Sequence, residues 1–110
     1  MSTKKIEQYE WKNFFDKFSK EHKTTLVTLE VISSEIGDQT EIRLQPLKGL
    51  SIDSKSDSLV VFTEDINHSI YHPKDIFVEE RDESRITIEI LDQDNNIQIL
   101  QLQDLTKRAS

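Results

Sequence analysis

The chain contains no cysteine, and it has only two glycines and two prolines among its 110 residues. Without cysteine it can form neither a disulfide framework nor a thiolate metal site. Two glycines are too few for the glycine-rich loops that hold phosphate groups in nucleotide-binding proteins. Disulfide-stapled, zinc-thiolate and phosphate-loop proteins are therefore excluded.

Long apolar runs are also missing. No stretch approaches the ~20 consecutive apolar residues of a membrane-spanning helix. The two lysines near the N-terminus are not followed by the apolar segment of a secretory signal. We therefore expect a cytoplasmic protein without a membrane partner. A chain of this length forms one domain, 1–110 with frayed termini, and buries a core without metal or disulfide support.

Positive charge is scarce in most of the chain. Residues 1–23 carry six Lys and four acids, a net charge of +2, whereas residues 24–110 carry eight Lys/Arg and seventeen acids, a net charge of −9. Proteins that bind nucleic acid need clustered Lys and Arg to contact phosphate groups. No such cluster is visible in this sequence, so we expect no nucleic-acid partner.

Residues 8–21 have the pattern of an amphipathic helix. Aromatic residues recur at i, i+3, i+4 and i+7 and so share one stripe. These predicted core residues are Trp11, Phe14, Phe15 and Phe18. Three oppositely charged pairs, four residues apart, favour a solvated opposite face: Lys12–Asp16, Asp16–Lys20 and Lys17–Glu21. No capping residue precedes the expected start of the helix.

From about residue 24 to 103 the apolar residues recur with a period of two, which is typical of β-strands. The expected strands are 24–33, 40–45, 50–53, 59–63, 67–71, 76–80, 85–91 and 96–102, the second and third being one interrupted strand. Pro46 and Gly49 form that interruption, which favours an edge strand with a bulge or bend.

Several of these strands are apolar on both faces, whereas a sheet with one solvated face has polar alternates. The fold class is therefore mainly β (α+β). We expect an N-terminal helix packed on a small, strongly bent antiparallel sheet or barrel of six or seven strands. Barrel closure and a second subunit are the two ways to cover the remaining apolar face, and both stay open.

Histidine and acidic residues offer little for a metal. His68 and His72 have the H-x-x-x-H spacing that binds metal on a helix, but on a strand they lie ~13 Å apart, too far for one zinc ion. The segment 92–96 opens like a calcium loop, but Ile97 and Gln103 stand where the loop needs glycine and glutamate. We therefore expect no metal and no cofactor.

The end of the predicted helix offers candidate binding residues. Asp16 and His22 point ~120° apart at ~100° per residue, and nothing marks an oxyanion hole, so Asp16, Ser19 and His22 are not a catalytic set. His22 extends the aromatic stripe by one turn, as a partly buried imidazole at a helix C-terminus would. The candidate binding residues are His22, Ser19, Asp16 and His68, and no catalytic residue is assigned.

Three short motifs are W-x-x-F-F-D-x-F-S-x-x-H at 11–22, P-L-x-G-L at 46–50 and H-x-I-x-x-P-x-x-I at 68–76. In these motifs the chain resembles a family of small uncharacterised bacterial proteins of about this length. The similarity covers about residues 10–80, and Ile52 stands where an aromatic residue is common in the family. The resemblance implies a shared fold and a bacterial origin, and it supplies no reaction.

Three functions follow from these observations. The first is a non-catalytic binding or protein-interaction module whose partner is another protein or a second copy of the chain. The alternative is a small-molecule binder or enzyme with a pocket between helix and sheet, near His22, His68 and the bend at 46–49. The third, a nucleic-acid-binding small barrel, rests on fold analogy alone. The sequence favours the first and leans against an enzyme.

Overall fold

The computed structural model describes residues 2–22, 24–33, 35 and 37–105. Within these residues the chain forms one helix, one 3-10 turn and eight strands. In chain order they are β1 (Ser2–Ile6), η1 (Gln8–Glu10), α1 (Trp11–Glu21), β2 (Thr25–Ser33), β3 (Gly37–Asp53), β4 (Ser58–Thr63), β5 (Asn67–Tyr71), β6 (Pro73–Glu80), β7 (Arg85–Asp92) and β8 (Ile97–Asp104). In this part of the chain, no helix is long and apolar enough to cross a membrane.

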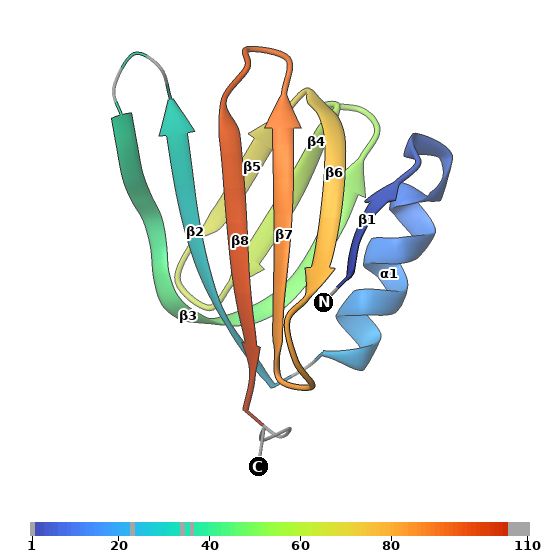
Figure 1. The fold of residues 1–110 in the computed structure, drawn as a ribbon, viewed down its shortest axis with the longest axis vertical. Coiled ribbons are helices and arrows are strands. Elements are labelled where there is room, and N and C mark those ends of the chain that lie inside the picture. The colour runs from blue at the N-terminus through green and yellow to red at the C-terminus, as the bar shows by residue number, and fades with distance from the viewer. Residues whose placement is uncertain (1, 23, 34, 36, 106–110) are drawn as a thin grey trace.

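The eight strands form one open antiparallel sheet in the order β1-β6-β7-β8-β2-β3-β4-β5. The first half of β3 pairs with β2 and its second half pairs with β4, with register shifts in both pairings. Figure 1 shows β3 curving from the front layer to β4 and β5 behind it. The prediction of a strongly bent antiparallel sheet is confirmed, whereas the sheet does not close into a barrel.

The interruption at Pro46 and Gly49 is a bend within one long strand. Pro46 pairs with Leu26 of β2, and the register shifts between Leu47 and Gly49 where β3 joins β4. A strand of 17 residues can thus serve two layers because its pairing partner changes halfway along. The predicted bulge or bend is confirmed, but the predicted edge position is wrong, because β3 lies between β2 and β4 in the sheet.

Strand β1 was absent from the sequence-based assignment. Its five residues include only one apolar side chain, Ile6, so no alternation of apolar and polar residues is visible. The strand forms because β6 supplies its hydrogen-bonding partner, with Ile6 opposite Ile76. The predicted count of six or seven strands was therefore one or two too low for the described part of the chain.

Helix α1 lies beside β1 at one side of the bent sheet and packs mainly on β3 (Figure 1). Trp11, Phe15 and Phe18 are buried in the core, whereas Phe14 is half-buried. No side chain caps the helix start, but the Trp11 indole N–H donates a buried hydrogen bond of 2.9 Å to the Ile6 carbonyl. A tertiary contact with β1 therefore fixes the start that sequence left unmarked.

Candidate functional site

A groove runs along α1 on the side of β1 and β6. Three cavities of about 320, 230 and 480 Å³ follow one another beside the helix. Phe14 and Lys17 line both the first and the second, and His22, Glu80 and Ile86 line both the second and the third. Because adjacent cavities share walls, they form one extended groove from η1 to the β6–β7 turn.

The floor of this groove is apolar. Phe18 and Val78 are buried, while Phe14 and Ile86 are only half-buried. The Phe14 ring meets Phe15 edge-on, with ring centroids 5.1 Å apart, and lies 6.1 Å from Phe18. The aromatic stripe of the helix thus extends from the core into the groove, where Phe14 presents an apolar surface.

The rim of the groove is charged, with opposite signs at its two ends. Lys4 and Lys17 outnumber Glu10 at the end near η1, whereas the end near the β6–β7 turn is lined by Glu80, Asp82 and Glu83. The groove therefore offers an apolar floor between a basic end and an acidic end.

One of the three ion pairs predicted on the helix is present: the Lys12 ammonium lies 3.0 Å from the Asp16 carboxylate. Lys17 and Glu21 take part in no ion pair within the described ranges, and both line the groove instead. Their charges are consequently directed to the groove rim rather than to each other.

His22 ends the helix and lines the acidic end of the groove. Its backbone N–H donates to the Phe18 carbonyl at 3.0 Å, and its ring stacks on the Phe18 ring with centroids 4.2 Å apart. Its Nδ1 lies 3.6 Å from Oδ2 of Asp104, a carboxylate only 7% exposed. His22 is therefore both a packed residue, 15% exposed, and part of the groove wall.

The other predicted binding residues lie outside the groove. The Ser19 hydroxyl accepts the Leu50 N–H at 2.9 Å and lies 2.9 Å from the Leu50 carbonyl, so it joins α1 to β3. Asp16 pairs with Lys12 on the helix surface. His68 lies on β5, opposite Val61 of β4. The structure does not bring His22, Ser19, Asp16 and His68 together, and Ser19 and Asp16 have structural partners.

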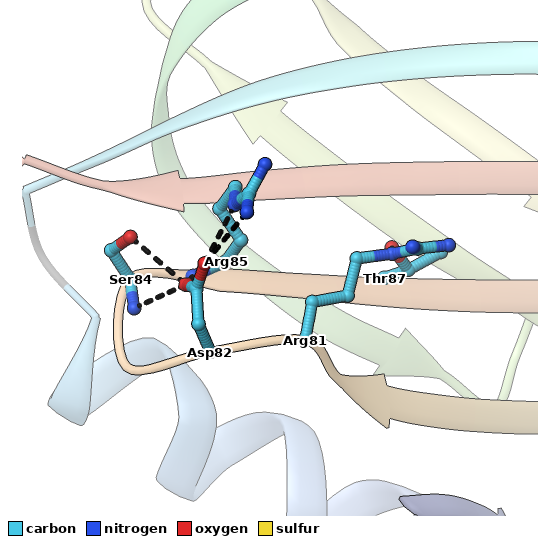
Figure 2. Close-up of polar contacts among 5 residues, drawn as sticks. All are labelled: Arg81, Asp82, Ser84, Arg85 and Thr87. Atoms are coloured by element: carbon cyan, nitrogen blue, oxygen red, sulfur yellow. Dashed lines mark hydrogen bonds and ion pairs between the residues drawn. The ribbon is translucent and has the colours of Figure 1, made fainter. Parts of the chain in front are cut away.

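The β6–β7 turn that carries the acidic end is held by Asp82. Oδ1 of Asp82 accepts the N–H groups of Ser84 and Arg85 at 2.9 and 2.8 Å, and Oδ2 lies 2.9 Å from Nε and 2.8 Å from Nη2 of Arg85 (Figure 2). The Arg85 side chain, followed by the Ser84 N–H, lowers the pKa of Asp82 to about 2. The sequence predicts only a gap between the strands 76–80 and 85–91 here, although Asp commonly accepts a hydrogen bond from the backbone two residues on in turns.

Acidic side chains elsewhere also stabilise turns. Oδ1 of Asp92 accepts the N–H groups of Asp94 and Asn96 at 2.9 and 3.0 Å, so the segment that opens like a calcium loop is a β7–β8 turn. Across the ranges that the structure covers, no group of three or more His, Cys, Asp or Glu side chains is arranged to hold a metal ion. The acidic end of the groove is thus a set of separate charges.

Comparison with known proteins identifies a family whose function is unknown. Residues 2–109 match the model of a family of unknown function, DUF5335. An uncharacterised protein of Aquifex aeolicus (strain VF5) is 45% identical over 103 residues, which are 93% of this chain and 93% of that protein. No solved structure matches the chain. These findings agree with the resemblance to small uncharacterised proteins, while the three motifs themselves stay a prediction.

Proposed function

The chain belongs to this family of unknown function, and we propose that it is a non-catalytic binding module that holds a short segment of a partner protein beside α1. The observation that carries the proposal is the continuous groove with an apolar floor between a basic and an acidic end. Protein interfaces commonly combine such an apolar centre with a polar rim.

The helix sets the length of segment that fits. α1 has 11 residues, and at ~1.5 Å per residue it is ~16 Å long. An extended chain advances ~3.3 Å per residue, so the groove beside α1 accommodates about five residues. β1 is an edge strand and lies between β6 and α1 (Figure 1), so its unpaired edge offers backbone groups to an added strand.

The charges at the two ends set the composition of the segment. An acidic side chain complements Lys4 and Lys17, and a basic side chain complements Glu80 and Glu83. Glu83 is exposed and takes part in no ion pair among the residues that the structure covers. An apolar side chain between these ends meets Phe14. The partner segment is therefore acidic, then apolar, then basic, or the reverse along its chain.

Selection from a displayed library of random peptides tests this composition. We expect enriched peptides to share an apolar residue between an acidic and a basic one, and to bind about tenfold more weakly to the variants Phe14→Ser and Glu83→Lys. Val60→Ser, a half-buried apolar position on β4 outside the groove, is the control for Phe14→Ser. No enrichment, or equal binding to Phe14→Ser and the control, would contradict the proposal.

Small-molecule binding at the His22 end is the second candidate function. The observation in its favour is the His22–Asp104 pair, in which a buried carboxylate lies 3.6 Å from a ring that lines a cavity of about 480 Å³. Such a pair can orient an imidazole toward a polar ligand. A thermal-shift screen of metabolites and divalent metals tests this candidate. If it is correct, at least one compound raises the melting temperature of the wild-type protein and does not raise that of His22→Ala.

A cytoplasmic location and self-association complete the proposal. Leu91, Ile97 and Ile32 are neighbours across β7, β8 and β2 and are each half-buried on the outer face of the sheet. Light scattering after size exclusion distinguishes a monomer from a dimer that uses this row, and Ile97→Asp would dissociate such a dimer.

A further inference from the structure

A further cavity lies on the outer face of the sheet over β2, β7 and β8 and shares one lining residue, Ile86, with the groove. Its volume is about 350 Å³, within the size range of small-molecule sites. Register places Thr87, Gln101 and Thr28 in one row across the three strands, and Arg85, Gln103 and Leu26 in the next. Side chains of both rows line the cavity, so the sheet register itself builds it.

Besides these two rows of side chains, the bend in β3 contributes Leu44 to the lining of the cavity. Leu44 has a backbone φ of +47°, a conformation that residues other than glycine seldom adopt. Its side chain lines the cavity, and the residue is 59% exposed. The Leu44 N–H donates to Thr28 Oγ1 at 3.2 Å, which holds the bend against β2. Backbone strain of this kind gathers at binding sites more often than elsewhere.

Two of the four arginines of the chain line this cavity, and none of the acidic residues that the structure describes does. The Arg81 N–H donates to the Arg85 carbonyl at 3.0 Å, so the two residues face each other across the β6–β7 hairpin. Like charges placed opposite each other in this way destabilise a hairpin. Asp82 offsets the charge of Arg85, and Glu79 lies 3.9 Å from Arg81.

Both guanidinium groups keep N–H groups for a ligand. Arg81 donates from Nε to Thr87 Oγ1 at 3.0 Å, and Arg85 uses Nε and Nη2 on Asp82. Each guanidinium has five N–H donors, and the side chains are 48% and 62% exposed. Within the residues that the structure covers, Nη1 of each arginine is therefore available.

We propose that this outer-face cavity binds a small hydroxylated molecule that carries one carboxylate or phosphate group. The arginines match the planar geometry of such an anion. Gln103 offers its amide to hydroxyl groups, and Leu44 covers the carbon skeleton. Gln101 offers its amide oxygen, because its Nε2 donates to Glu30 Oε1 at 3.3 Å. In a chain with a net charge of −7, two arginines thus line one cavity, although Asp82 and Glu79 lie beside them.

Isothermal titration of the full chain with glucose 6-phosphate, gluconate, glucose and inorganic phosphate tests the site. We expect saturable binding of glucose 6-phosphate or gluconate, at least about tenfold tighter than that of glucose. Tighter binding of glucose 6-phosphate identifies the anionic group as a phosphate, and tighter binding of gluconate identifies it as a carboxylate. If neither charged sugar derivative saturates at millimolar concentration, or if glucose binds equally well, the proposal is wrong. Binding of inorganic phosphate alone would also overturn it, because the hydroxyl contacts would then contribute nothing.

Variants inside and outside the cavity test whether these ligands bind there. Arg81→Gln and Gln103→Ala should each weaken binding at least about threefold, whereas Lys55→Gln, which removes a positive charge in the β3–β4 turn, and Gln93→Ala should not. Gln103 is exposed, so its variant keeps the test valid if Arg81→Gln does not fold. Equal weakening by Arg81→Gln and Lys55→Gln would show a general charge effect and overturn the proposal. Because these variants lie outside the groove, failure here leaves the peptide-binding proposal intact.

Discussion

The two sides of helix α1 differ in how closely the sheet covers them. On the side packed on the core and β3, Phe15 is fully buried and the Ser19 hydroxyl hydrogen-bonds to the Leu50 backbone. On the side of β1 and β6, Phe14 is half-buried, and Lys17 and Glu21 line an open groove. One side of the same helix thus secures the fold, while the other keeps apolar and charged groups available to a partner.

Phe15→Ala should have the largest effect on stability. Its ring is fully buried, and removing such a ring leaves a cavity that costs about 3–5 kcal/mol of unfolding free energy. Urea unfolding followed by circular dichroism measures the loss. An unchanged unfolding midpoint would show that the core side of the helix is no better packed than the groove side.

Ser19→Ala should destabilise the protein by about 1–3 kcal/mol, because the part-buried Leu50 N–H loses its side-chain acceptor. Ser54→Ala, at an exposed position in the β3–β4 turn, is the matched control and should be nearly neutral. Peptide affinity should not change in either variant once both are folded. Weakened peptide binding in folded Ser19→Ala would instead place Ser19 in the site, as the sequence alone suggested.

His22→Ala should lower both stability and partner affinity, since His22 packs on Phe18 and also lines the groove. Loss of the ring stacked on Phe18 costs about 1 kcal/mol, and loss of a groove wall weakens partner binding. Unfolding and peptide titration on the same sample separate the two effects. Reduced stability with unchanged affinity would restrict His22 to a structural role.

Asp82→Asn should have the smallest effect, and that effect should depend on pH. Because the folded-state pKa of Asp82 is lowered to about 2, its ionised form stabilises the fold. This contribution is complete above the unfolded-state pKa of about 4 and disappears as the pH falls through about 2. The melting-temperature difference between wild type and variant should therefore shrink over that range, and a constant difference would contradict the assignment.

Periodicity alone predicted the main elements. The aromatic spacing from Trp11 to Phe18 located the helix, and alternation located seven of the eight strands described. Pro46 and Gly49 located the bend in β3. These features depend on local patterns, which one sequence displays directly.

The groove could not be predicted, because it depends on distant contacts. β1 has one apolar residue and forms only by pairing with β6, and the helix start depends on the Trp11 bond to Ile6. Helical spacing places Phe14 and Phe15 on one stripe, yet Phe15 is buried whereas Phe14 is only half-buried. Spacing likewise pairs Lys17 with Glu21, whereas tertiary structure directs both to the groove.

The measurement that tests the central claim compares two exposed tyrosines. Tyr9 is 83% exposed and lines the groove near η1, while Tyr71 is 57% exposed on β5, outside it. Replacing either with alanine should leave the unfolding midpoint unchanged. If the groove beside α1 is the binding site, Tyr9→Ala weakens the affinity for a selected peptide about tenfold and Tyr71→Ala leaves it unchanged. Equal affinities of the two variants would contradict the account.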